Sequence, residues 1–210
     1  MSKQHVRVPK MNLKEEGLMF NDPYVYACIK RYMNEETKAA FPSMSRLKKD
    51  SGLSEPTILA SVRRLQDKGY IKILKTEGRS NKYIFDDVKK FEIFSYDFLD
   101  NPKLTKNEKA YLVNTQQYMF KEPIAQKGII EYSTDTICDL IAIDKRTLRK
   151  YEKSLQEKDV LTLIPVTLRD PETGLNQYQR VYSFQEFANV LALKVNELSD
   201  DVEDIKKRLS

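Results

Sequence analysis

The sequence contains no tryptophan and a single histidine, His5, among 210 residues. One histidine excludes the His-hydrophobe-His metal site that rolling-circle nickases and relaxases need. No G-x-x-x-x-G-K-[ST] phosphate loop is present, which argues against ATP hydrolysis. The two cysteines, Cys28 and Cys138, lie far apart in apolar patterns with no zinc-ligand spacing, and are expected to be reduced core thiols. We therefore expect no cofactor, no metal and no enzymatic activity.

Long apolar runs are also missing, so no membrane-spanning segment is expected. The first ten residues, MSKQHVRVPK, lack the apolar centre of a signal peptide, and we expect a cytoplasmic protein. Apolar residues still make up 40% of the chain, which is sufficient for compact cores of modest size.

The net charge of +5 is unevenly distributed along the chain. Residues 1–90 hold 19 basic and 11 acidic side chains, whereas residues 91–184 hold 13 basic and 14 acidic ones. The N-terminal part is therefore the stronger candidate for binding a polyanion.

The chain aligns with itself, which predicts an internal duplication. The offset is 86 residues at first, and four extra residues in the second half raise it to 90 from Ser43 onward. Identical pairs include Leu13 with Leu99, Leu18 with Leu104, Ser43 with Ser133, Thr57 with Thr147 and Leu65 with Leu155. We expect three segments, residues 1–90, 91–184 and 185–210.

The sequence patterns of the two halves predict the same order of helices and strands. An extended start (residues 6–8 or 93–94) leads into a helix (residues 22–36 or 105–120), with Thr105 and Glu108 forming a capping box in the second half. A short helix follows from Ser43 or Ser133, and then come a tight turn, a longer helix and two strands. The segment between the halves, FDDVKKFEIFSYDFLD, is rich in apolar residues, so we expect it to be buried and the halves to pack together.

The stretch SGLSEPTILASVRRLQDKGYIKI, which starts at Ser51, carries the most specific pattern. Gly52 marks a turn, Ser54 is placed to cap the next helix, and Pro56 is tolerated in its first turn. The inward face is predicted from the apolar residues that step by four and three along the helix: Ile58, Val62 and Leu65.

The opposite face of this helix is expected to point outward and to contact DNA. Small residues let a helix approach a groove floor, and hydroxyl and guanidinium groups bind base edges or phosphates. The predicted contacts of the first half, which include the preceding short helix and the following KTEGRSNK hairpin, are Arg46, Lys48, Pro56, Thr57, Ala60, Ser61, Arg63, Arg64, Lys75, Arg79 and Lys82. The alternative is an ordinary amphipathic helix with a solvated face.

The sequence RLKKDSGLSEPTILASVRRLQDKGYIKILKTEGRSNKYIF resembles the winged helix-turn-helix family. The resemblance implies a recognition helix for the major groove and a β-hairpin wing for the backbone or minor groove. The second half follows the same plan, with a basic helix whose predicted contacts are Lys145, Arg146, Thr147, Arg149, Lys150 and Lys153. Glu152 stands where the first half has Val62, and Tyr151 is an alternative packing residue that would rotate the helix. A degenerate second unit that only pairs with the first is the alternative.

The fold class that we expect is α+β, mainly α. Two tandem winged helix-turn-helix units would form a pseudo-twofold internal dimer, followed by a C-terminal helix. Such a dimer places two recognition helices in successive major grooves of one duplex. The tail carries a heptad pattern that predicts either self-association or packing on the chain's own domains, through Leu191, Val195, Leu198, Val202, Ile205 and Leu209.

Tandem winged helices of this size resemble families encoded by mobile elements. These are the TraN-like accessory proteins of Gram-positive conjugative plasmids, the plasmid replication initiators and the phage replisome organisers. The first resemblance implies a regulator or accessory factor in conjugative transfer, and the others imply an initiator that melts origin DNA, which permanganate reactivity of origin thymines would detect. A protein-interaction module is the third reading, and a steep fall of DNA affinity with salt would argue against it.

Overall fold

The computed structural model describes residues 4–75, 80–118, 120–121, 128–130, 133–169 and 176–184, with β8 beyond Leu163 and β6, β7 and β9 described by their backbone. Arg79 and the six heptad residues lie outside this range. The chain is a mixture of helices and sheets and forms two compact units. Unit 1 comprises Met1–Gln117 and Asp135–Tyr151, and unit 2 comprises Tyr118–Thr134 and Glu152–Ser210. These units cut across the predicted division at residue 90.

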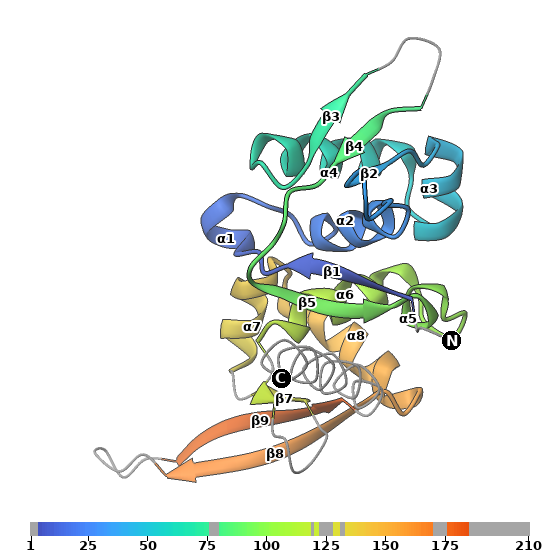
Figure 1. Cartoon of the computed structure of the whole chain (residues 1–210). Coiled ribbons are helices and arrows are strands. Elements are labelled where there is room, and N and C mark those ends of the chain that lie inside the picture. Colours follow the sequence, from blue (N-terminus) through green and yellow to red (C-terminus); the bar gives the residue numbers. More distant parts are fainter. Residues whose placement is uncertain are drawn as a thin grey trace, which may run out of the picture. The chain divides into compact units, whose positions relative to one another are not determined.

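Unit 1 contains both short strands and helices (Figure 1). They are β1 (His5–Pro9), α1 (Leu13–Glu16), α2 (Asp22–Lys30), β2 (Ala39–Ala40), α3 (Met44–Ser51), α4 (Glu55–Asp67), β3 (Lys72–Leu74), β4 (Lys82–Ile84), β5 (Phe91–Ser95), α5 (Tyr96–Asp100), α6 (Lys106–Gln116) and α7 (Thr134–Ile141). Helix α8 (Lys145–Glu157) begins in unit 1 and ends in unit 2.

Unit 2 is built on one antiparallel sheet in the order β6-β7-β9-β8. Its strands are β6 (Phe120–Lys121), β7 (Gly128–Ile130), β8 (Leu161–Arg169) and β9 (Asn176–Phe184). Strands β8 and β9 pair along their whole length, from Leu161 opposite Phe184 to Arg169 opposite Asn176.

Side-chain caps fix where the helices of unit 1 begin. The hydroxyl groups of Ser43, Ser54 and Thr105 accept hydrogen bonds from backbone N–H groups in the first turns of α3, α4 and α6. The capping box of Thr105 and Glu108 is confirmed, because both of its reciprocal hydrogen bonds form. The predicted helix over residues 22–36 is too long, since α2 ends at Lys30 and the chain then turns back.

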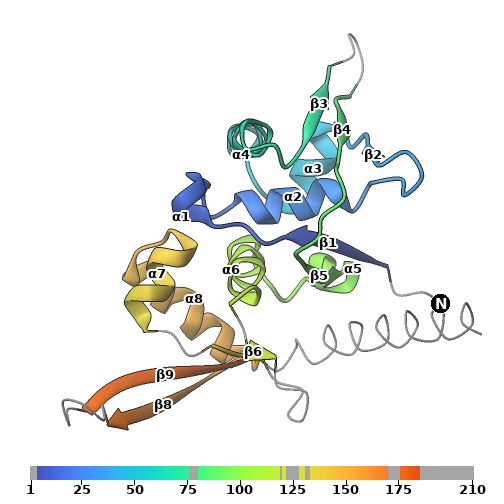
Figure 2. The same ribbon diagram turned by 60° about the vertical axis from the view of Figure 1, so that its left-hand side comes forward.

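Helix α2 is the centre of unit 1, with every residue from Asp22 to Ile29 buried. It packs against α3, α4, α6 and β1, so it lies between the helix pair α3–α4 and the strands β1 and β5 (Figure 2). The predicted inward residues of α4, Ile58, Val62 and Leu65, are all buried. Helix α4 is thus held against the core of unit 1 through α2.

Strands β1 and β5 form a two-stranded antiparallel ladder that joins the two extended starts. At its centre Arg7 lies opposite Ile93, and these residues are 86 apart, which is the offset at which the two halves align. Val6 lies opposite Phe94 and Val8 opposite Glu92, with all four side chains buried. The prediction of burial for the segment between the halves is confirmed for its apolar residues Ile93, Phe94 and Leu99, whereas its charged residues 86–87 and 89–90 are exposed.

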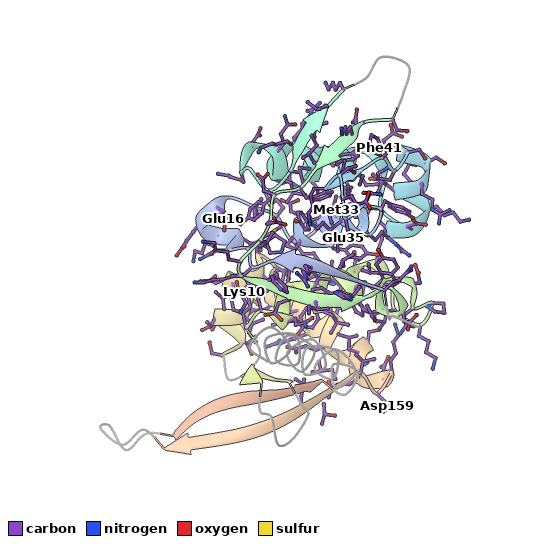
Figure 3. The ribbon with its side chains drawn as sticks, viewed as in Figure 1. Lys10, Glu16, Met33, Glu35, Phe41 and Asp159 are labelled. Atoms are coloured by element: carbon purple, nitrogen blue, oxygen red, sulfur yellow. The ribbon has the colours of Figure 1, made fainter. Side chains whose placement is uncertain are left out.

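Helices α7 and α8 have bounds that match those of α3 and α4. Helix α7 occupies the residues of α3 plus 90, and α8 occupies the residues of α4 plus 90. The left-handed backbone positions also correspond, since Gly52 (φ 67°) and Gly69 (φ 77°) match Ala142 (φ 54°) and Asp159 (φ 57°). Asp159 follows the end of α8 (Figure 3). The second segment therefore makes the same two turns without glycine.

Replacing Ala142 with glycine should raise the free energy of unfolding by about 0.5–1 kcal/mol, because glycine removes the Cβ strain of a left-handed backbone. Ala142 is exposed, so the substitution leaves no cavity. The measurement is urea unfolding followed by circular dichroism. The control, Ala60→Gly in the middle of α4, should lower the same quantity by roughly 1 kcal/mol. An equal destabilisation by both substitutions would contradict the strain argument.

No helix among the described residues is long and apolar enough to cross a membrane.

Candidate nucleic-acid interface

The turn between α3 and α4 is held by backbone and side-chain hydrogen bonds. Gly52 adopts its left-handed conformation at the C-terminus of α3, and its N–H donates to the carbonyl oxygen of Lys48. Ser54 Oγ accepts from the N–H of Thr57 at 3.4 Å and lies 2.8 Å from Thr57 Oγ1. Glycine is required at position 52 because a left-handed turn is strained for other residues. These contacts fix the direction in which α4 leaves the turn.

The face of α4 that points away from the core is small and partly apolar. Pro56 and Arg63 are exposed, and Thr57 and Ala60 are half-buried. Leu59 is 38% exposed on the same helix, although it is not among the predicted DNA contacts. An exposed leucine in this position is suited to contact a thymine methyl group. The face therefore carries one cation, Arg63, with no acidic partner among the described residues. The side chains beside it are short enough for α4 to come close to a ligand.

The prediction that Ser61 points outward is wrong. Ser61 is 0% exposed, because it lies three residues after Ile58 and four before Leu65 on the buried stripe of α4. Its hydroxyl lies 3.4 Å from Nη2 of Arg64. Ser61 therefore lets α4 pack closely on the core and is unavailable to a ligand.

Arg64 also differs from its predicted role, because its guanidinium binds the carboxylate of Asp22. Nε and Nη2 of Arg64 each donate to Asp22 at 2.8 Å. Asp22 is 0% exposed and also accepts from the N–H of Met19, whereas the side chain of Arg64 is 29% exposed. The pair joins α4 to the first turn of α2. Arg64 therefore holds α4 in place against α2.

The predicted cations of α3 lie at the surface and have acidic neighbours. Arg46 Nε donates to Asp50 at 3.1 Å and to the hydroxyl of Tyr32 at 2.9 Å. Lys48 lies 3.4 Å from Glu55. Both cations remain about half exposed, so these surface pairs are weak and their charges stay available to a polyanion.

The hairpin β3–β4 and strand β2 form a three-stranded sheet in the order β2-β4-β3. Lys75 is exposed at the end of β3, and Lys82 on β4 lies over the ring of Phe41, with Nζ 5.8 Å from the ring centroid. Phe41 (Figure 3) is 57% exposed and Leu74 is 52% exposed. The wing thus combines cations with exposed apolar side chains, a combination that fits the sugar and phosphate edges of a DNA groove.

The basic helix of the second half, α8, is capped by Asp144. Asp144 accepts from the N–H of Thr147 at 2.9 Å and from its hydroxyl at 2.7 Å. Glu152 is buried, so α8 keeps the inward position that Val62 has in α4. Tyr151 packs as well, stacked on Phe20 with ring centroids 5.8 Å apart.

The predicted cations of α8 are all exposed: Lys145, Arg146, Arg149, Lys150 and Lys153. Thr147 is half-buried. Lys145 pairs with Asp135, and Lys153 lies 3.9 Å from Glu157. Arg146, Arg149 and Lys150 therefore form the basic surface that α8 presents to solvent.

Two other kinds of chemistry, metal binding and thiol reactivity, have little support among the residues that the structure describes. No group of three or more His, Cys, Asp or Glu side chains there is arranged to hold a metal ion. Cys28 and Cys138 are buried and form no disulfide, as predicted, and burial raises the pKa of the Cys28 thiol to about 12. The thiol of Cys28 is therefore protonated and unreactive at neutral pH.

Comparison with known proteins agrees with the geometry of the first segment. Residues 22–71 match the model of a family described as a helix-turn-helix domain. The matched region runs from the start of α2 through α3, the Gly52 turn and α4 to the residue before β3. No curated protein matches the chain. Residues 22–71 are thus similar to the helix-turn-helix domains that are typical of DNA-binding proteins.

Proposed function

We propose that the protein binds double-stranded DNA in a sequence-specific manner, with α4 as the recognition helix in the major groove. The observation that carries this proposal is the outward face of α4, where Pro56 and Arg63 are exposed and Ala60 is half-buried. Short side chains permit close approach, and Arg63 is the group that reads a guanine or binds a phosphate. Lys75 and Lys82 of the wing supply backbone contacts.

We further propose that the chain acts as an internal dimer that reads two half-sites. Support comes from the ladder of β1 and β5, whose central pair Arg7 and Ile93 consists of residues that correspond in the two halves. The corresponding helices α2 and α6 also pack on each other. An antiparallel pair of corresponding residues is what a twofold axis through that pair would produce, and the proposal is that such an axis relates the two helix-turn-helix segments. The target is then an inverted repeat with half-sites about one helical turn, roughly 34 Å, apart.

In biological terms the proposal is a non-enzymatic, cytoplasmic regulator or accessory factor of a mobile element, such as a conjugative plasmid. The resemblance of the tandem winged helices to TraN-like accessory proteins supports this role. The alternative is a plasmid or phage replication initiator, which uses the same duplex contacts and adds melting of the origin.

Selection of binding sites from random duplex, followed by hydroxyl-radical footprinting, tests the proposal. We expect an inverted repeat, with protection on one face of the duplex in two blocks about 10–10.5 base pairs apart. Direct-repeat and single-half-site duplexes of equal length serve as controls and should bind more weakly. Protection of a single half-site would remove the internal dimer, and equal affinity for random duplex would remove sequence-specific binding.

A further inference from the structure

Helices α4 and α8 begin with the same kind of cap. Ser54 Oγ accepts from the N–H of Thr57 and lies 2.8 Å from its Oγ1, and 90 residues later Asp144 makes the corresponding two contacts with Thr147. Both threonines are half-buried, and both helices are 13 residues long. Residues that are 90 apart therefore occupy equivalent positions on the two helices, so their side chains can be compared one by one.

The outward faces of these two helices differ in charge at three equivalent positions. On α4 the three side chains are uncharged: Pro56, Leu59 and Ala60. On α8 all three are cations: Arg146, Arg149 and Lys150. These three residues, the α8 cations, are fully on the exposed side of the helix. The two helices thus share a scaffold but present different chemistry to a ligand.

The α8 cations have no carboxylate partner within the part of the chain that the structure describes. The acidic residues nearby in the sequence are engaged by other groups. Asp144 caps the helix, Asp135 pairs with Lys145, and Asp139 lies 3.0 Å from Lys14. The charges of the α8 cations are therefore available to an external anion.

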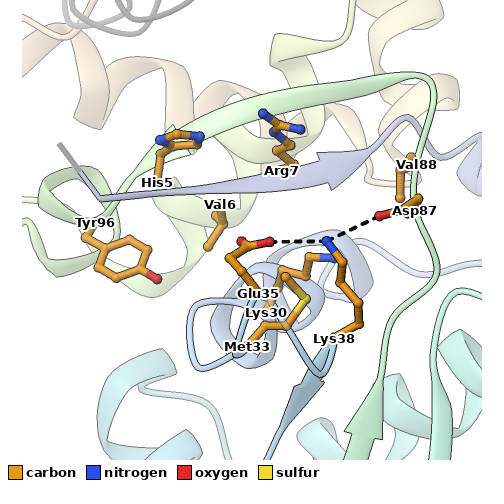
Figure 4. Close-up of a pocket in the computed structure, with 10 residues that line it drawn as sticks. All are labelled: His5, Val6, Arg7, Lys30, Met33, Glu35, Lys38, Asp87, Val88 and Tyr96. Carbon is orange, nitrogen blue, oxygen red and sulfur yellow. Dashed lines mark hydrogen bonds and ion pairs between the residues drawn. The ribbon is translucent and has the colours of Figure 1, made fainter. Parts of the chain in front are cut away.

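The lysines near the end of α2 show the opposite arrangement. Lys38 Nζ lies 3.3 Å from Glu35 and 3.5 Å from Asp87, between the two carboxylates in Figure 4. Lys30 lines the same cavity, so two lysines there face two carboxylates and their charges balance. A local cluster of cations in unit 1 is thus not by itself a surface for a polyanion, and the lack of neighbouring acids distinguishes the α8 cations.

We propose that the α8 cations bind phosphates of the duplex, so that α8 supplies the larger share of the sequence-independent affinity and α4 the larger share of the sequence selection. This inference rests on the proposed binding of duplex DNA. A cation that neutralises a phosphate releases condensed counterions and raises the affinity for any sequence. Short or apolar side chains, such as Ala60 and Leu59, instead permit contact with base edges and thymine methyl groups. The half-site at α8 should therefore tolerate base changes better than the half-site at α4.

The test removes the α8 cations together in the full chain, as the triple variant Arg146→Ala, Arg149→Ala, Lys150→Ala. Fluorescence anisotropy measures the affinity for the selected duplex and for a random duplex over a range of salt concentrations. Each lost phosphate contact reduces the slope of log K against log salt by about 0.9, so the slope should become shallower by roughly 2–3. At about 0.15 M salt both duplexes should lose roughly a hundredfold in affinity. Circular dichroism should show an unchanged fold, because alanine favours helices and the three positions are exposed.

The matched control replaces three exposed lysines outside the helices with alanine: Lys89, Lys90 and Lys103. It removes the same charge and should change the slope by less than about 1. Leu59→Ala should weaken only the complex with the selected duplex. An unchanged slope in the triple variant, an equal effect of the control, or a loss confined to the selected duplex would overturn the proposal, since the last result would mean that the α8 cations read bases. Failure of the unmodified chain to bind any duplex would instead remove the proposed function, and this inference with it.

Discussion

Replacing Arg64 with methionine is expected to lower the free energy of unfolding by about 3 kcal/mol or more, because it leaves the fully buried Asp22 carboxylate without its cation. Methionine keeps the length of the side chain and much of its apolar contact, so the loss reports mainly on the charge pair. The measurement is guanidinium unfolding monitored by circular dichroism, with the midpoint and slope both fitted.

The neighbouring arginine supplies the control for this experiment. Arg63→Met, on the exposed face of the same helix, should change stability by no more than about 0.5 kcal/mol. The double variant Asp22→Leu, Arg64→Met removes both charges and should be more stable than Arg64→Met alone. A stable Arg64→Met variant that had lost only DNA affinity would show that Arg64 reads DNA, as the sequence alone suggested.

Arg63→Ala is expected to weaken binding to the selected DNA site by about 1–3 kcal/mol, a factor of roughly 5–150, while the fold is unchanged. The reason is that Arg63 is the exposed guanidinium on the outward face of α4. Fluorescence anisotropy on specific and random duplexes should show the loss chiefly on the specific one. Lys14→Ala, at an exposed cation of α1, is the matched control and should alter neither affinity. Equal losses on both duplexes would instead make Arg63 a phosphate contact.

The helices and turns of unit 1 were predictable because their signals are local. Hydroxyl residues that can cap a helix indicate three helix starts, at Ser43, Ser54 and Thr105. Gly52 indicates the turn, because it adopts a left-handed conformation that is strained for other residues. The pairing of β1 with β5 was not predictable in the same way. Two short apolar segments 86 residues apart carry no local signal for each other.

The candidate interface was predictable in part. The period of the apolar stripe places Pro56, Ala60 and Arg63 outward, but Ser61 also fits that stripe, at three residues from Ile58 and four from Leu65. Ser61 was not recognised as an inward residue because its side chain is small and polar, although its spacing from Ile58 and Leu65 indicated that it would be buried. The contact of Arg64 with Asp22 spans 42 residues and depends on how α4 crosses α2, which no sequence spacing encodes.

The ladder of β1 and β5 also constrains the order of events during synthesis. Strand β1 emerges from the ribosome first, and its partner follows 86 residues later, a delay of roughly 4–17 s at ordinary translation rates. In that interval Val6 and Val8 lie on an unpaired strand edge, which is a template for association with other chains. A chain that ends before Phe91 therefore leaves the edge of β1 unpaired. We expect such a chain to aggregate and to be bound by chaperones.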